Sequence, residues 1–236
     1  CWLVQTEDYT NAEELFNDEY AYFSSTSSSW LNHAFNYCET ITQKLQLSKD
    51  SFVVELASND GYLLKNFVEL GVPCLGIEPT KKTAQVSRDL GIDVKEVFFS
   101  KNVALQLVSE GRKADLIIGN NVYAHVPDIN DFTEGVAVLL KSNGVVTFEF
   151  PHLMELINKI QFDTIYHEHF SYLSLISIKS IFSKFGLKIF DVDQLGTHGG
   201  SLRVYGCLQH ANHKISNNVE KILNDEIEAG LMNKDI

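Results

Sequence analysis

The sequence contains no continuous apolar run of the ~20 residues that a membrane-spanning helix requires. Its first ten residues also lack the basic start and the apolar stretch of a secretory signal peptide. These absences predict a cytoplasmic protein with no membrane partner. The chain does not begin with Met, so we expect its native N-terminus to be missing or processed.

Cysteine is scarce and scattered, because the four residues Cys1, Cys38, Cys74 and Cys207 form no C-x-x-C pair. This spacing predicts neither a complete zinc site nor a disulfide framework. Positive charge is also in deficit, and the formal net charge is −12. An acidic surface repels a phosphate backbone, which predicts no nucleic-acid partner. One anionic small molecule in a locally basic or amide-lined pocket stays compatible with this charge.

The remaining composition is that of an ordinary globular protein, with 44% apolar and 21% charged residues in a chain of 236. From residue 49 onward, short β-branched runs alternate with amphipathic stretches. Strands are predicted at 52–57, 74–78, 115–119 and 145–150, and helices at 62–70, 81–90, 103–109 and 131–141. This alternation predicts βαβ units in a mostly parallel sheet.

The part of the chain beyond residue 150 departs from this pattern. A helix is predicted at 175–185, followed by two strands at 187–195 and 201–209 that are joined by a glycine-rich turn. Such strands predict an antiparallel hairpin at one edge of the sheet, which is more typical of methyltransferases than of dehydrogenases.

Three regions are predicted from these patterns. Residues 1–48 form an N-terminal helical and aromatic segment, with helices at 12–18 and 30–47. Residues 49–210 form the cofactor-binding domain. Residues 211–236 carry a helix at 217–231 that leads toward a further domain, which we expect to be missing from this chain.

The first strand runs into a helix through V-V-E-L-A-S-N-D-G at residues 53–61. A dinucleotide-binding loop would carry G-x-G-x-x-G, so that a pyrophosphate can lie on the helix N-terminus. This loop has only Gly61 and instead carries Glu55 and Asp60, which repel a pyrophosphate but suit a sulfonium and an α-ammonium group. Glu78, ~20 positions further on, suits ribose hydroxyls in either cofactor class. The alternative is that Glu55 caps a sheet edge and Asp60 a helix.

Three histidine-bearing segments fall at the carboxyl ends of the predicted strands, where ligands bind in open α/β sheets. They are residues 120–125, the segment Y-H-E-H at 166–169, and His198 in the final turn. An imidazole suits removal of a proton at neutral pH, and a nearby tyrosine or histidine can stabilise an enolate oxygen. His167 and His169 lack the H-x-x-x-H spacing of a helical metal site, and no metal is predicted. A role as plain surface or core histidines is the alternative.

Five segments now occur in a recognisable order: E-L-A-S-N-D-G, G-I-E-P, N-N-V-Y-A-H-V, Y-H-E-H-F-S-Y and T-H-G-G-S-L-R. Together they resemble the S-adenosylmethionine-dependent C-methyltransferases of deoxysugar biosynthesis, which methylate C3 of a nucleotide-linked 4-keto sugar. The resemblance implies an α/β, Rossmann-like class I methyltransferase fold with a mostly parallel seven-stranded sheet and a terminal antiparallel hairpin. It also implies S-adenosylmethionine as cofactor and a small-molecule partner. The oligomeric state is not predicted.

The same resemblance assigns roles to individual residues. His169 is the general base, Tyr166, Glu168 and His125 line its pocket, and Tyr20 reaches over the active site. His198 and Ser201 are expected on the substrate side. The expected cofactor contacts are Glu55, Ala57, Ser58, Asn59, Asp60, Gly61, Glu78, Pro79, Phe99, Asn120 and Asn121.

The chain departs from the family pattern in three respects. Ala57 stands where glycine is usual, Cys1 resembles the last ligand of a lost zinc module, and the C-terminal domain is expected to be absent. Arg203 is the only obvious cationic residue in the motif segments, so the residues that would contact the substrate diphosphate are not predicted. The alternatives are an O- or N-methyltransferase of the same fold, an NAD-dependent oxidoreductase or epimerase, and a non-catalytic binding module.

Overall fold

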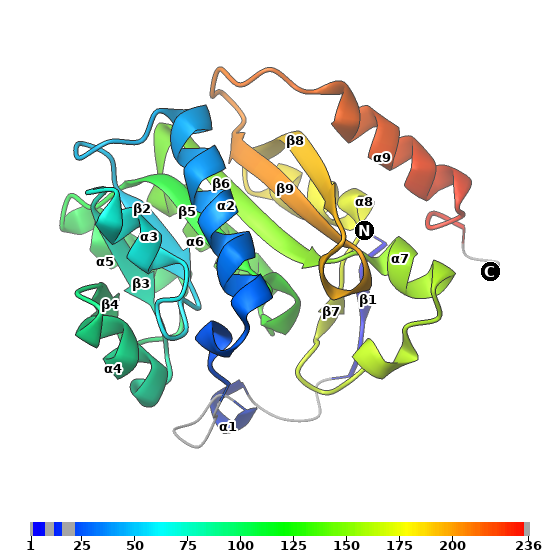
Figure 1. Ribbon diagram of the computed structural model, residues 1–236. Helices are drawn as coiled ribbons and strands as arrows, with labels where there is room; N and C mark the ends of the chain where they lie inside the picture. Colours follow the sequence, from blue (N-terminus) through cyan, green and yellow to red (C-terminus); the bar gives the residue numbers. More distant parts are fainter. Residues whose placement is uncertain (1, 8–11, 16–21, 234–236) are drawn as a thin grey trace.

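Five strands form the parallel part of a seven-stranded sheet in the computed structural model, which describes residues 2–7, 12–15 and 22–233 (Figure 1). These strands are β2 (Val53–Leu56), β3 (Cys74–Ile77), β4 (Asp93–Lys95), β5 (Ala114–Asn120) and β6 (Leu140–Pro151). Most of their residues are buried, because helices cover both faces of the sheet.

The predicted hairpin closes this sheet at one edge. Strand β9 (Ser201–Leu208) lies antiparallel between β6 and β8 (Leu187–Leu195), so the strand order is β4-β3-β2-β5-β6-β9-β8. The α/β fold class and the antiparallel ending are therefore confirmed. The sequence patterns missed β4, because three residues are too few to show a period. They also missed a small second sheet, in which β1 (Val4–Gln5) pairs with β7 (Ser171–Tyr172).

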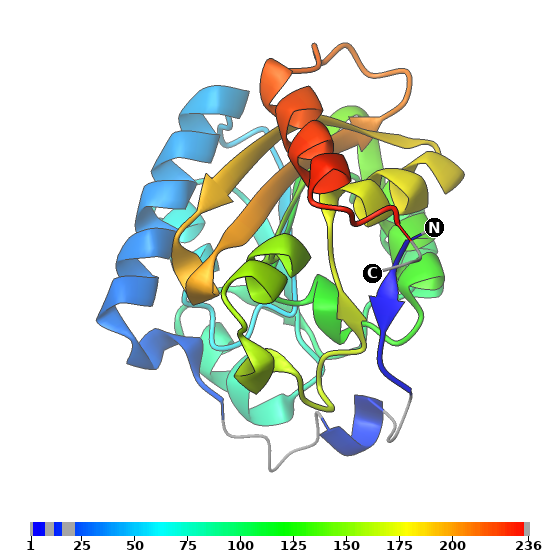
Figure 2. The ribbon, with the colours of Figure 1, turned by 90° about the vertical axis from the view of Figure 1, so that its right-hand side faces the viewer.

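Helices form a layer on each face of the sheet (Figures 1 and 2). One face is covered by α2 (Ser28–Leu45), α3 (Leu64–Glu69) and α4 (Lys81–Asp89), and the other by α5 (Lys101–Ser109), α6 (Ile129–Leu139), α8 (Leu175–Lys184) and α9 (Asn217–Glu228). Two short helices, α1 (Ala12–Leu15) and α7 (Leu153–Asn158), complete the described elements. No helix in the described ranges is long and apolar enough to cross a membrane.

Most predicted helices were right to within a few residues at each end. The prediction for 131–141 ran too far, because α6 ends at Leu139 and β6 begins at Leu140. The prediction for 30–47 began too late, because Ser27 caps α2 by accepting a hydrogen bond from the Trp30 N–H. Helix α9 ends at Glu228, three residues before its predicted end.

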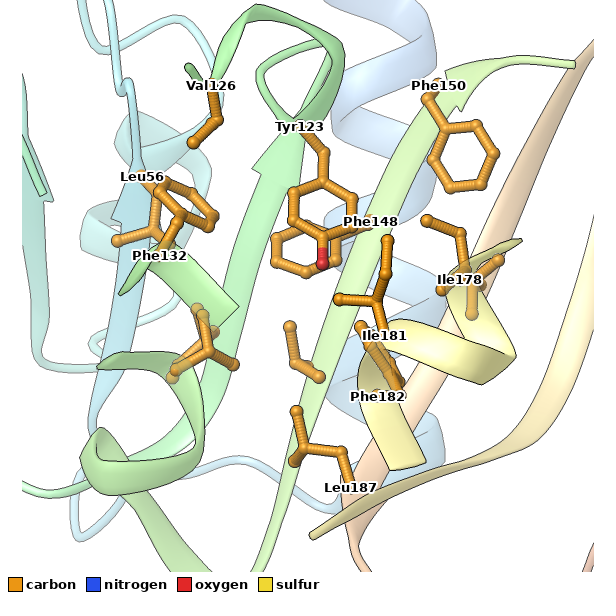
Figure 3. Close-up of a cluster of buried hydrophobic side chains, with 14 of the residues drawn as sticks. Leu56, Tyr123, Val126, Phe132, Phe148, Phe150, Ile178, Ile181, Phe182 and Leu187 are labelled. Atoms are coloured by element: carbon orange, nitrogen blue, oxygen red, sulfur yellow. The ribbon is translucent and has the colours of Figure 1, made fainter. Parts of the chain in front are cut away.

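The two faces of the sheet have different cores. On the α6–α8 face, Tyr123 stacks on Phe148 with ring centroids 4.3 Å apart, and Phe182 packs edge-on beside them (Figure 3). On the other face, Tyr37 and Ile41 of α2 are buried in one cluster with residues of β2 and β5. The predicted N-terminal segment thus contributes a helix to the core of the sheet, and the boundary at residue 48 stays a prediction.

Helix α9 is held to the fold by one buried carboxylate. Glu226 accepts hydrogen bonds from the backbone N–H groups of Leu175 (2.6 Å) and Ile176 (2.8 Å) at the start of α8. It also pairs with His152 at 2.7 Å, and both side chains are buried. An acidic side chain at a helix N-terminus is favourable because the first amide groups of a helix lack partners.

Candidate active site

The loop from β2 to α3 lies at the carboxyl edge of the sheet and has an unusual backbone. Ala57 (φ 55°) and Asn59 (φ 51°) adopt the left-handed conformation, which costs energy for residues with a Cβ. Gly61 (φ 79°) could not be replaced cheaply, because a Cβ there would lie 2.6 Å from the Ile92 side chain and 2.7 Å from Ser87 Oγ. The loop is thus both strained and closely packed.

Several buried polar atoms around this loop lack hydrogen-bond partners among the described residues. They are Glu55 Oε2, Ser58 Oγ, Asp60 Oδ1, both amide atoms of Asn120 and Asn121 Oδ1. Buried polar groups are nearly always satisfied in folded proteins, so a group of exceptions in one place indicates a ligand. Most of these atoms are acceptors.

The buried acidic groups of this region also indicate a ligand. Glu55 is 1% exposed, and burial, then Glu78 and Asp60, raise the pKa of its carboxyl. A positively charged ligand that donates hydrogen bonds would satisfy the unpaired acceptors and would also offset the repulsion among these buried carboxylates. The ammonium and sulfonium groups of S-adenosylmethionine meet that description, so the residues present fit this cofactor.

Glu78 is positioned by two backbone amides beside the loop. Its Oε1 accepts from the Thr80 N–H and its Oε2 from the Asn59 N–H, both at 2.9 Å. A carboxylate oxygen can accept a second hydrogen bond, so a ribose hydroxyl can still donate to Glu78. Pro79 follows it directly. Phe99, also predicted to contact the cofactor, has apolar surroundings, in contrast to Glu78. Its ring packs edge-on against Phe132 of α6 with centroids 5.2 Å apart.

Two of the three histidine segments of the sequence, those of His125 and His169, meet at this edge. His169 is 8% exposed, and its Nδ1 donates to the Thr164 carbonyl oxygen at 2.8 Å. This bond fixes the tautomer, so that Nε2 carries the lone pair of the neutral ring. Burial lowers the pKa of His169, which favours that neutral form at pH 7.

Three further rings lie beside His169. Their centroid distances to it are 4.2 Å for Tyr166, 4.7 Å for His125 and 6.0 Å for Tyr172. His125 Nδ1 donates to the Glu168 carbonyl oxygen at 2.8 Å, and burial, followed by His169, lowers the pKa of His125 to about 4. Burial and Glu168 raise the pKa of the Tyr166 phenol, so it stays protonated. Four predicted residues are thus brought together.

Two predictions fall outside the described residues, namely Tyr20 and Cys1. In the part of the chain that the structure describes, no group of three or more His, Cys, Asp or Glu side chains could hold a metal ion. Sequence reasoning also missed a support for His169. The Thr6 hydroxyl donates to the His169 carbonyl at 2.9 Å, and β1 pairs with β7 immediately beyond it.

The hairpin turn carries the predicted substrate residues. His198 is exposed, has a left-handed backbone (φ 50°) and meets the Trp30 ring edge-on with centroids 5.2 Å apart. Ser201 is 2% exposed, and its hydroxyl donates to the Thr197 carbonyl oxygen at 2.9 Å. The hydroxyl that we expected on the substrate side therefore braces the turn.

A buried ionic cluster beneath this turn was not predicted. Glu149 of β6 is fully buried and accepts hydrogen bonds from Arg203, from His33 at 2.9 Å and from Thr197 Oγ1 at 3.0 Å. Burial alone would raise the pKa of Glu149, but His33 and Arg203 outweigh it and hold that pKa low. Arg203, considered above for a substrate diphosphate, is instead 7% exposed and paired inside the fold.

The sequence did contain a signal for this cluster. Glu149 interrupts the apolar run V-V-T-F-E-F, and a carboxylate in a buried strand requires a cationic or hydrogen-bonding partner. Trp30 and His33 are three positions apart on α2, a spacing at which helical side chains touch, and their rings stack with centroids 4.9 Å apart.

Known proteins were compared with this chain. Residues 30–192 match the family described as methyltransferase domain. The chain is 33% identical to the C-methyltransferase NovU of Streptomyces niveus over 98% of this chain and 55% of that protein. It is 28% identical to a ubiquinone biosynthesis O-methyltransferase of Bartonella quintana (strain Toulouse) over 40% of this chain and 38% of that protein. The chain therefore spans about half the length, or less, of these relatives.

Solved structures show the same fold at low identity. An S-adenosylmethionine-dependent methyltransferase of Clostridium acetobutylicum ATCC 824 superposes with a TM-score of 0.58 at 13% identity, covering 75% of this chain and 92% of that one. The magnesium protoporphyrin IX methyltransferase of Synechocystis PCC 6803 with bound SAH gives 0.55 at 14% identity, covering 75% and 81%. The chain belongs to the methyltransferase domain family and has the fold of class I S-adenosylmethionine-dependent methyltransferases.

Proposed function

We propose that this chain is the cofactor-binding core of an S-adenosylmethionine-dependent methyltransferase that methylates a carbon atom of a nucleotide-linked 4-keto deoxysugar. The observation that carries the proposal is His169, a buried histidine whose Nδ1 donates to a backbone carbonyl, in a fold whose β2–α3 loop carries a group of unsatisfied acceptors. The similarity to the C-methyltransferase NovU over 98% of the chain supports a carbon acceptor.

The cofactor is held by acidic and amide side chains at the carboxyl edge. Glu55, Asp60 and Asn120 face its charged end, and Glu78 accepts from its ribose hydroxyls. When bound, S-adenosylmethionine supplies an electrophilic methyl group on a positively charged sulfur. The buried, anionic surroundings match that charge before the reaction.

The acceptor carbon is activated by His169. Its Nε2 takes the proton from the carbon beside the keto group, and the C–H electron pair passes into the enolate. The protonated Tyr166 phenol, next to the base, donates a hydrogen bond to the enolate oxygen. Neutral His125 does not serve as that donor, because its one N–H is directed to the Glu168 carbonyl. Its ring instead packs against the base and orients it.

An oxygen acceptor is the second candidate. Ubiquinone biosynthesis O-methyltransferases, including those of Bartonella quintana and Pelagibacter ubique, match about 100 residues of the chain at 26–28% identity. His169 would then remove a hydroxyl proton, with the same tautomer. The family match favours methyl transfer of either kind over the NAD-dependent alternative.

Ligand binding and hydrogen exchange test the proposal together. S-adenosylhomocysteine at 100 times its dissociation constant should stabilise the fold by about 2.7 kcal/mol, whereas NAD⁺ should not. A nucleotide-linked 4-keto sugar in D₂O should exchange the hydrogen beside its keto group when the protein is added, and His169→Gln should abolish the exchange. Stabilisation by NAD⁺ alone would overturn the cofactor. Methylation at oxygen without exchange would establish the second candidate.

A further inference from the structure

The polypeptide just before α2 is attached to the cofactor loop by three hydrogen bonds. The Asn59 side chain accepts from the Ser24 N–H and donates to the Tyr22 carbonyl oxygen, both at 2.9 Å. Asp60 Oδ2 accepts from the Ser25 N–H at 3.1 Å. These bonds join segments 35 to 37 residues apart in the sequence. We call residues 22–26 the strap.

The strap lies against Asp60, one of the residues with an unsatisfied buried atom. Asp60 uses one carboxylate oxygen for the strap, while its other oxygen is among the buried atoms without a partner. Residues 24 and 25 lie near the carboxyl end of β2, because their partners Asn59 and Asp60 closely follow that strand. A ligand that reaches Asp60 Oδ1 therefore lies next to the strap.

The far end of the strap is anchored on the same loop. The strap leads through the capping residue Ser27 into α2, whose Trp30 ring stacks on Tyr62 with centroids 6.0 Å apart. Tyr62 directly follows Gly61 of the cofactor loop. The strap itself is hydrogen-bonded to the side chains of Asn59 and Asp60. These two side chains therefore set the distance between the strap and the cofactor loop.

We propose that Asn59 is a positioning residue that latches the strap onto the cofactor loop and so controls how fast the cofactor enters and leaves. This inference rests on the proposed function. Sequence reasoning made Asn59 a cofactor contact, but its side-chain oxygen and one N–H are engaged by the strap. None of the three bonds uses Asp60 Oδ1, so the latch is compatible with both the free and the cofactor-bound protein and restrains entry as well as release.

Two variants weaken the latch from opposite sides. Asn59→Gly removes two of the bonds and suits the left-handed backbone at this position. Ser24→Pro removes only the Ser24 N–H. Proline is tolerated at the first position of a helical turn, and Phe23 before it has the extended backbone (φ −111°, ψ 114°) that proline requires.

Matched controls leave the latch intact. Ser24→Ala keeps the N–H that Asn59 accepts. Ser28→Pro places proline at the first position of α2, again after an extended residue, Ser27 (φ −101°, ψ 115°). Both controls should bind S-adenosylhomocysteine with wild-type rates.

The measurement is surface plasmon resonance with S-adenosylhomocysteine, which gives both rate constants. Ser24→Pro should raise the association and dissociation rates about 5-fold, and Asn59→Gly about 30-fold, because each net hydrogen bond is worth close to one order of magnitude or less. The dissociation constant should change less than about 3-fold. A direct cofactor contact would raise only the dissociation rate, and either that result or unchanged rates would overturn the latch.

Hydrogen exchange separates this inference from the proposed function. In the protein without ligand, Asn59→Gly should speed exchange of the Ser24 and Ser25 amides by at least about tenfold, while Ser28→Pro should not. Wild-type protein that fails to bind S-adenosylhomocysteine would remove the proposed function. Unchanged exchange in Asn59→Gly would remove the latch itself, whatever the ligand.

Discussion

Two buried glutamates at the carboxyl edge of the sheet have opposite surroundings. Glu55 of β2 has a carboxylate oxygen without a partner and two acidic neighbours, Asp60 and Glu78. Glu149 of β6 is enclosed by Arg203 and His33, together with a threonine hydroxyl. Burial and like charges raise the pKa of Glu55, whereas the cationic partners lower that of Glu149.

The comparison separates binding from structure. A carboxylate that the fold neutralises stabilises the fold, whereas one that the fold leaves unsatisfied is kept at a cost until a ligand arrives. Ala57, Asn59 and Asn121 have positive φ beside the unsatisfied group, and His198 has positive φ in the turn above Glu149. Strained residues concentrate where function overrides stability.

His169 combines both conditions, since one ring nitrogen is satisfied and the other is left for chemistry. His169→Gln should therefore reduce turnover by about 10²–10⁴-fold, the range of acid–base catalysis. Its affinity for S-adenosylhomocysteine should stay within about 2-fold of wild type. Steady-state kinetics and calorimetry measure the two effects. His167→Gln, two residues earlier and exposed, is the matched control. Full turnover in His169→Gln would remove its role as base.

Removing the carboxylate of the paired cluster around Glu149 should lower the stability of the fold. Glu149→Ala leaves Arg203 buried without its carboxylate and should lower the free energy of unfolding by about 3–5 kcal/mol. Urea denaturation measures this change. Glu39→Ala, on the exposed face of α2, should cost less than about 1 kcal/mol. A loss of less than about 1 kcal/mol in Glu149→Ala would contradict a stabilising role of the Glu149 cluster.

Acid should destabilise the fold through the half-buried imidazole of His125. The pKa of His125 is lowered from 6.5 to about 4, so the unfolded chain binds a proton that the folded chain refuses between these values. Stability from this group is complete above pH 6.5 and is lost as the pH falls toward 4, on the order of 3 kcal/mol. His125→Gln should lack this loss. Parallel acid limbs in the two stability curves would contradict the assignment.

Removing the charge of the unpaired carboxylate Glu55 should leave the stability of the fold intact and weaken cofactor binding. Glu55→Gln removes a carboxylate that has no cationic partner, so the free energy of unfolding should change by less than about 1 kcal/mol or increase. Affinity for S-adenosylhomocysteine should fall about 10- to 100-fold, equivalent to one charged hydrogen bond. Calorimetry and urea denaturation give both values. Strong destabilisation without loss of binding would show that Glu55 is structural.

The smallest effect is expected at the strained backbone. Ala57→Gly relieves the left-handed strain but adds chain entropy to the unfolded state, so we expect a gain of about 0.5 kcal/mol. Ala104→Gly within α5, where the backbone is helical, should instead lose about 1 kcal/mol or more. Thermal denaturation distinguishes the two. A loss in Ala57→Gly would show that the methyl group packs favourably.

Much of this molecule could be predicted from local patterns. The alternation of apolar runs and amphipathic stretches predicted the parallel sheet, because each period reflects the burial of one element. The turn at 196–200 predicted the hairpin, and Glu55, Asp60 and Glu78 were marked by acidic residues in an otherwise apolar region. The resemblance carried by the Y-H-E-H segment implied that Tyr166 lies beside His169, and their ring centroids are 4.2 Å apart.

Other features depended on contacts between distant segments. Nothing local to Asn59 indicates that it bonds to Tyr22 and Ser24, and nothing in T-H-G-G-S-L-R indicates that Arg203 turns inward to Glu149. The sequence by itself determined the elements and the chemistry available at the edge of the sheet, since those depend on residue type and period. Only the tertiary structure decided which polar groups are satisfied and which await a ligand, because hydrogen-bond partners come from segments folded together.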